Sequence, residues 1–166
     1  YFTSKLQKVS LNAFEGCHGL VSVSLPSESI EILDYAFYQC GSLNEVINLD
    51  SIKVFNEYVF SGTNFRNLVI NATLIKKGAF ANCYSLDSVD VTADEIGDSA
   101  FNFCTALTNL KVNALTIGAN TFNNCRNLEN IELINVKVIG DSAFKDCMYL
   151  STSINIDFFS NTDNSL

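Results

Sequence analysis

The chain has 166 residues, 48% of them hydrophobic, which is enough for one domain with a well-developed core and argues against a disordered segment. Ten basic and eighteen acidic residues give a formal net charge of −8, so we expect no nucleic-acid partner, because phosphate backbones bind clustered Lys and Arg. No apolar run reaches the roughly 18 residues of a membrane span, and the first ten residues, YFTSKLQKVS, lack a secretory signal. We therefore expect no direct membrane insertion and no targeting signal within this chain.

A segment built from Ala-Phe, then Cys, then Leu recurs along the chain. The phenylalanines that anchor the copies are Phe14, Phe37, Phe60, Phe80, Phe101, Phe122 and Phe144. Successive anchors are 23, 23, 20, 21, 21 and 22 residues apart. Self-similarity at this period is typical of a solenoid, in which each unit stacks on its neighbours because it cannot bury its apolar face alone.

Each copy predicts the same elements in the same order. An apolar residue stands five positions before the anchor, and a cysteine follows three positions after it in six of the seven copies. The Ala-Phe-x-x-Cys-x-x-Leu part has three-residue spacing after Asp-Ser or Gly-Ala, which predicts a short helical turn with its N-cap. The next part alternates apolar and polar residues, as in LDSVDV at 86–91, which predicts a strand with one buried face.

Two copies depart from the pattern. In the third copy Thr63 replaces the cysteine and the next apolar residue, Phe65, comes one position early, which indicates a local deletion. In the second copy Asn48 stands where the last apolar residue of the strand belongs. We therefore expect the second and third units to be the least regular.

The repeat resembles the BspA-like (Treponema pallidum-type) leucine-rich repeats, whose units read roughly I-G-x-x-A-F-x-x-C-x-x-L-x-x-I-x-L-P. The resemblance extends from about Val9 to Leu150, although the turn proline survives only at Pro26. It implies an α/β solenoid, a right-handed superhelix of about seven repeats of 20–23 residues, with a parallel sheet on the concave face and short helical turns on the convex face. We expect one leucine-rich repeat domain over residues 1–166, in which 151–166 form a partial terminal unit or tail.

The interior of such a solenoid needs one large apolar wedge in each unit, and the anchor phenylalanine supplies it. The six cysteines admit three interpretations: a buried, reduced ladder, occasional disulfides, or a metal site. Equivalent positions point their side chains in parallel, whereas a disulfide needs facing Cβ atoms, and Thr63 stands in the same ladder. There is no Cys-x-x-Cys pair and His18 is the only histidine, so we favour the reduced ladder and expect no metal and no cofactor.

The outward positions of the predicted strands form the candidate binding surface. They are polar, with several acidic side chains and few aromatic ones. The candidate residues are Ser22, Glu45, Asn67, Asp87, Ser88, Asp90, Asn109, Lys111, Glu129, Asn130 and Glu132. The alternative is that these are solvated strand positions without a partner.

Two further signals carry less weight. Asn71 begins the N-glycosylation sequon NAT, which matters only in a host that glycosylates secreted protein, and chance alone would produce one in an Asn-rich chain. The sequence has no nucleophile with a base, no phosphate loop, and carboxylates that exposed strand positions explain. We therefore expect no enzyme activity.

The resemblance implies a non-catalytic protein-interaction module of a cell-surface or secreted adhesion protein, whose partners are extracellular-matrix or host surface proteins bound on the concave sheet. An intracellular scaffold or regulator, or a structural spacer in a longer surface protein, is the alternative. A carbohydrate-binding module is a weaker third, because the inner face offers little aromatic surface. The uncapped edge YFTSKL would permit end-to-end self-association.

Overall fold

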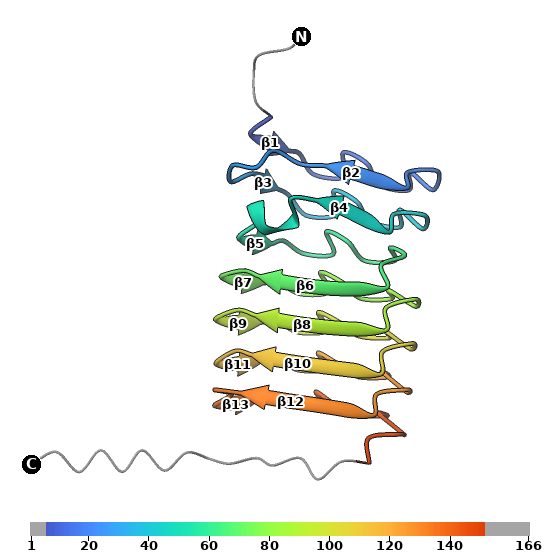
Figure 1. Ribbon diagram of the computed structural model, residues 1–166, viewed down its shortest axis with the longest axis vertical. Helices are drawn as coiled ribbons and strands as arrows, with labels where there is room; N and C mark the ends of the chain where they lie inside the picture. Colours follow the sequence, from blue (N-terminus) through green and yellow to red (C-terminus); the bar gives the residue numbers. More distant parts are fainter. Residues whose placement is uncertain (1–5, 152–166) are drawn as a thin grey trace, which may run out of the picture.

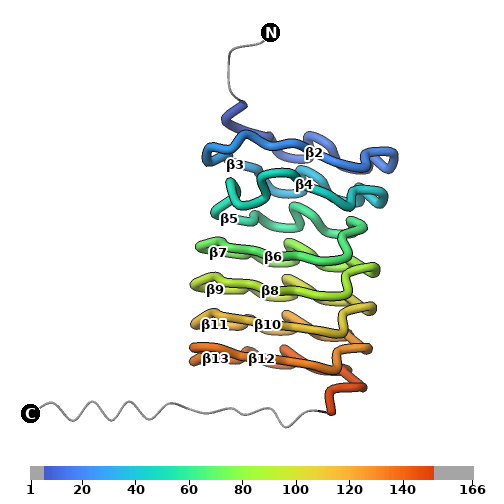
Figure 2. The backbone as a smooth tube through the Cα atoms, in the orientation of Figure 1, coloured from blue at the N-terminus to red at the C-terminus, as the bar shows by residue number. Residues whose placement is uncertain are grey.

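Each copy of the repeat forms one coil, and the coils stack into a column (Figure 1; Figure 2). The computed structural model describes residues 6–151. The terminal unit expected over 151–166 therefore lies outside the described residues, apart from Ser151, as does most of the YFTSKL edge.

One side of the column is formed by the strands that the Leu-x-x-Val-x-Leu pattern predicts. A four-stranded sheet, in the order β12-β10-β8-β6, consists of β6 (Asn67–Asn71), β8 (Ser88–Thr92), β10 (Asn109–Asn113) and β12 (Asn130–Ile134). A separate pair continues this side in the first two coils and consists of β2 (Ser22–Ser24) and β4 (Glu45–Ile47). All neighbours in these sheets pair in parallel.

A second row of two-residue strands was not predicted. It contains β1 (Lys8–Val9) paired with β3 (Glu31–Ile32), and a five-stranded sheet of β5 (Val54–Phe55), β7 (Leu74–Ile75), β9 (Glu95–Ile96), β11 (Thr116–Ile117) and β13 (Val138–Ile139). Its second residue is always the apolar residue that stands five positions before the anchor. Two residues are too few to show an alternation, so the sequence marks the position without revealing a strand.

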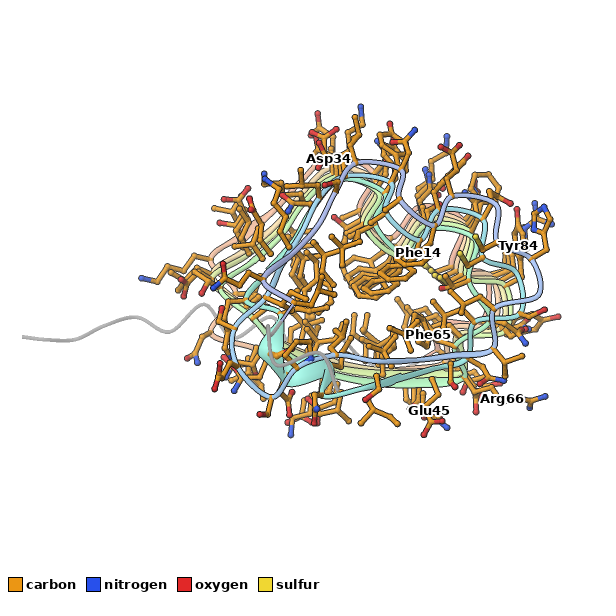
Figure 3. All side chains as sticks on the ribbon, turned by 90° about the horizontal axis from the view of Figure 1, so that it is seen from above. Phe14, Asp34, Glu45, Phe65, Arg66 and Tyr84 are labelled. Carbon is orange, nitrogen blue, oxygen red and sulfur yellow. The ribbon has the colours of Figure 1, made fainter. Side chains whose placement is uncertain are left out.

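The anchor phenylalanines form a continuous stack through the column. Successive ring centroids lie 5.1–5.8 Å apart, and the ring planes are within 17° of parallel. The five inner rings are at most 1% exposed, while Phe14 in the first coil is 42% exposed. Seen along the column, Phe14 and Phe65 point into the interior, whereas Glu45 and Arg66 point outward from the sheet (Figure 3). The predicted role of these rings as wedges is confirmed.

The predicted helical turns are wrong, and the fold is a β-solenoid with almost no helix. Around each anchor the residues two before and two after it have positive φ, for example Ser99 (56°) and Phe103 (60°) around Phe101. Alternate N–H groups leave the coil: those of Ser99, Phe101 and Phe103 each donate to a carbonyl of the next coil at 2.9 Å. The intervening N–H groups, such as that of Asn102 to the carbonyl of Ser99 (3.1 Å), close turns within the coil.

An α-helix requires every N–H to bond four residues back in its own segment, and the stacking of coils takes half of these donors. Three-residue spacing occurs both in a helix and in this succession of turns. The sequence pattern therefore favoured a helical turn, which is wrong. Within residues 6–151 the one helix is the short 3₁₀ segment η1 (Leu49–Ser51).

The irregularity expected in the second unit is confirmed, whereas the third unit keeps a regular five-residue strand, β6. Strand β4 ends before Asn48, which has φ 62° and ψ 38° and donates from Nδ2 to the carbonyl of Leu25 at 2.8 Å. The chain then enters η1, and β4 is not hydrogen-bonded to β6, so the sheet is interrupted there. In the third unit Phe65 is 2% exposed and takes the interior place that leucine has in the other coils.

The cysteines, which stand three residues after the anchor phenylalanines, form a ladder along the column. Cys40, Cys83, Cys104 and Cys125 are fully buried, Cys147 is half-buried in the last described coil, and Cys17 is exposed in the first. Five of the six thiols donate to the carbonyl of an anchor phenylalanine in the preceding coil, at 3.0–3.4 Å. These five side chains are thus more than small apolar fillers, because they also link neighbouring coils. All six cysteines are free in the structure.

We predict that one thiol of the six reacts rapidly with Ellman's reagent in the native protein. Cys17 is exposed, whereas burial raises the pKa of the Cys147 thiol to about 12 and also raises the pKa of Cys40 and Cys104. Since the thiolate is the reacting species, even the half-buried Cys147 should react slowly at pH 8. Cys17→Ala should remove the fast phase, and all remaining thiols should react after unfolding in guanidinium chloride. Two or more fast thiols in the native protein would contradict the buried ladder.

Candidate functional site

The four-stranded sheet positions the candidate residues by its register. Along each strand inward and outward side chains alternate, and in β10 Leu110 and Val112 are buried while Asn109 and Lys111 are exposed. Strands pair without offset between equivalent residues, so that Asn109 lies opposite both Ser88 and Asn130. Each outward position therefore becomes a row that crosses the coils. Because the side chains in these rows lie outside the core, they can be substituted without disturbing its packing.

Six of the candidate residues line one shallow hollow of about 360 Å³ on this face. They are Ser88, Asp90, Asn109, Lys111, Asn130 and Glu132. The hollow spans all four strands, and Val69, at 72% exposed, is the apolar side chain on its outward lining. A shallow, mainly polar hollow with one exposed apolar side chain suits a short polar segment of a partner protein.

A chain of hydrogen bonds holds part of this surface in place. Asn130 Nδ2 donates to Asn109 Oδ1 at 2.9 Å, and Asn109 Nδ2 donates to Thr108 Oγ1 at 2.7 Å. Thr108 Oγ1 in turn donates to Asp87 Oδ1 at 2.7 Å. These side chains from three coils are preorganised, which lowers the entropy cost of binding. Thr108 was not among the candidate residues. The available signal was that it follows the repeat leucine of its unit, the place that Asp87 and Glu129 occupy in the neighbouring units.

The charges of the surface alternate along one row and are acidic in total. Asp90, Lys111 and Glu132 lie opposite one another on β8, β10 and β12. Asp87 and Glu129 stand just before β8 and β12 on the same face. Four carboxylates against two cations, Lys111 and the outward-pointing Arg66, favour a partner with basic side chains.

The remaining candidate residues are not part of the hollow. Ser22 and Glu45 pair with each other on the separate β2–β4 sheet. Asn67 lies opposite Ser88 at the edge strand β6, next to Val69, which lines the hollow and is 72% exposed. Asn71, the sequon residue, ends β6 and is exposed, and its carbonyl accepts a hydrogen bond from Lys53 Nζ at 3.4 Å.

Catalytic and metal-binding constellations are not evident in the described part of the chain. His18 is exposed, with Nδ1 2.9 Å from the carbonyl of Gln39. Among residues 6–151 no three His, Cys, Asp or Glu side chains gather in a way that could hold a metal ion. No helix in this range is long and apolar enough to cross a bilayer.

A column of parallel coils with this repeat and a polar sheet face defines a leucine-rich repeat protein. The model of the BspA type leucine-rich repeat region matches residues 1–108 and 75–165, with six copies. The chain therefore belongs to the BspA-type leucine-rich repeat family. No protein among those with curated descriptions matches it significantly.

Two solved structures are similar to the column. A leucine-rich repeat protein from Bacteroides ovatus is 29% identical, with a TM-score of 0.81, over 86% of this chain and 39% of its own. A leucine-rich repeat protein from T. pallidum is 26% identical, with a TM-score of 0.75, over 90% of this chain and 74% of its own. This chain thus spans well under half the length of the Bacteroides protein.

Proposed function

We propose that the chain is a non-catalytic module that binds a protein partner through the four-stranded sheet. The observation that carries this proposal is the preorganised acidic surface, in which Asp87, Thr108, Asn109 and Asn130 are hydrogen-bonded across three coils beside the hollow. The partner would present basic and small polar side chains to it. Leucine-rich repeats commonly serve as interaction modules, and membership of the family supports this class of function.

We further propose that the module belongs to a cell-surface or secreted adhesion protein, whose partners are extracellular-matrix or host surface proteins. The support is the family, which is often associated with surfaces. We also propose that residues 1–166 form one leucine-rich repeat domain, since the period persists along the chain. A structural spacer within a longer surface protein is the second candidate, favoured by the small share of the Bacteroides protein that this chain spans.

The test is binding of the purified chain to a panel of extracellular-matrix and host surface proteins. In the matched variant Asp87, Asp90, Glu129 and Glu132 are all changed to Lys, which reverses the charge of the surface. These side chains are outside the core, so the variant should fold, with an unfolding midpoint close to that of the native chain. We expect it to lose at least about tenfold in affinity.

A second variant serves as the control. Changing Glu15, Asp94, Glu95 and Asp141 to Lys makes the same change in net charge at exposed positions outside the four-stranded sheet. Binding that survives in the first variant and falls in the control would place the interaction elsewhere. Absence of binding to every member of the panel would favour the spacer.

A further inference from the structure

Three tyrosines form a cluster on the turn side of the second and third coils. The rings of Tyr35 and Tyr58 are stacked, with centroids 5.2 Å apart and planes 14° from parallel. Tyr38 meets both edge-on, at 5.5 Å from Tyr35 and 6.5 Å from Tyr58. All three side chains are half-buried at the surface. We call Tyr35, Tyr38 and Tyr58 the tyrosine cluster.

Two members of the tyrosine cluster occupy a backbone conformation that bulky residues avoid. Tyr35 has φ 57° and Tyr58 has φ 52°. At the same place in the other turns, two residues before the anchor, the chain has small or polar residues: Asn12, Gly78, Ser99, Asn120 and Ser142. Positive φ is easily adopted by Gly and Asn and is costly for a large side chain. The other coils have no tyrosine at this position, so the packing of the column does not require one.

The stack is supported on one side and ends on the other. A Cβ on Gly78 would lie 2.3 Å from Tyr58 Cε1, so the ring of Tyr58 rests directly on the glycine of the fourth coil. Tyr58 covers one face of Tyr35. On the side of the first coil the equivalent residue is Asn12, a smaller and exposed side chain that is bonded to Glu15. The other face of Tyr35 is therefore the end of the stack.

Two carboxylates flank the tyrosine cluster: Asp34 beside Tyr35 in the second coil and Glu57 beside Tyr58 in the third. Asp34 precedes Tyr35, and its Oδ1 accepts the N–H of Glu57 at 2.9 Å. Partial burial, the neighbouring Tyr58 and the charges of Glu57 and Asp34 together raise the pKa of the Tyr35 phenol, as expected for an acidic environment. Lys77 follows Glu57 in the same row of the next coil, on the far side from Asp34.

We propose that the tyrosine cluster, with Asp34, binds an arginine side chain from a basic segment of a protein partner. A planar guanidinium would continue the stack on Tyr35, with its N–H groups directed to the Asp34 carboxylate, which is a geometry that Arg offers and Lys does not. Tyrosine and arginine are also among the residue types that concentrate binding energy at interfaces. Asp34 lies on the side of the coil opposite Glu45 and Arg66 (Figure 3), so this surface is separate from the sheet and independent of the function proposed for it.

The test is a titration of the whole chain with a capped peptide of alternating glycine and arginine, followed by NMR chemical shifts. The same peptide with citrulline in place of arginine keeps the shape and removes the charge. We expect saturable binding of the arginine peptide and at least about tenfold weaker binding by Tyr35→Asn. The matched control is Tyr84→Asn, which removes a tyrosine that is 59% exposed outside the cluster and should leave affinity unchanged.

A measurement of stability separates binding from structure. Asn accepts positive φ readily, so Tyr35→Asn should unfold at the same or a higher denaturant concentration than the native chain while binding more weakly. The proposal is overturned if the arginine peptide does not bind, if Tyr35→Asn binds it as well as Tyr84→Asn does, or if the citrulline peptide binds equally. Loss of stability in Tyr35→Asn would instead assign the cluster a structural role.

Discussion

Phe101→Ala should lower the free energy of unfolding by about 3–5 kcal/mol, the range for removing a fully buried ring from a packed core. Phe101 is 0% exposed and stacks between Phe80 (5.2 Å) and Phe122 (5.3 Å), so its loss leaves a cavity in the middle of the column. Because each coil contacts mainly its neighbours, the coils on either side should be affected together. Denaturant unfolding followed by circular dichroism measures the change.

The chain offers a matched control two residues further on. Phe103 is 40% exposed and has φ 60°, so Phe103→Asn removes an aromatic ring without opening the core and places a residue that tolerates this φ. Its unfolding free energy should change by less than about 1 kcal/mol. Similar losses in the two variants would mean that the phenylalanine stack does not dominate the stability of the column.

Gly118→Ala should lower the free energy of unfolding by about 1–3 kcal/mol, the usual cost of overpacking. A Cβ at this position would lie 2.7 Å from the backbone nitrogen of Asp98 and 2.8 Å from the carbonyl carbon of Gly97. These are backbone atoms of the preceding coil, and they are held by the hydrogen bond from the N–H of Gly118 to the carbonyl of Ile96 at 2.7 Å. The coils cannot separate locally without breaking that bond.

Gly41→Ala is the control for the glycine, since a Cβ on Gly41 meets nothing within 4 Å. It should leave the denaturation midpoint almost unchanged. The effect of replacing glycine on the unfolded chain is common to both variants. The difference between their unfolding free energies therefore measures the effect of the close approach between coils at Gly118. If both variants unfold alike, the close approach at Gly118 has no energetic consequence.

The polar surface was predictable residue by residue but not as a site. Alternation along β8, β10 and β12 identified Asp90, Lys111 and Glu132 as outward-facing. Their grouping with Asn109 and Asn130 in one hollow depends on pairing without offset, which sequence alone does not establish. Ser22 and Glu45 looked equivalent in the sequence, yet the interruption between β4 and β6 leaves them on a different sheet.

The sequence by itself determined the repeat, the interior places of Phe, Cys and Leu, and the family, because a solenoid needs the same side chain at the same place in every coil. Only the tertiary structure decided the conformation of the turns. Three-residue spacing fits a helix and a succession of turns equally well, and the choice is made when N–H groups such as that of Phe101 bond to the next coil instead of to their own segment. The same stacking brings Tyr35 onto Tyr58 across 23 residues of sequence, a contact that no local pattern contains.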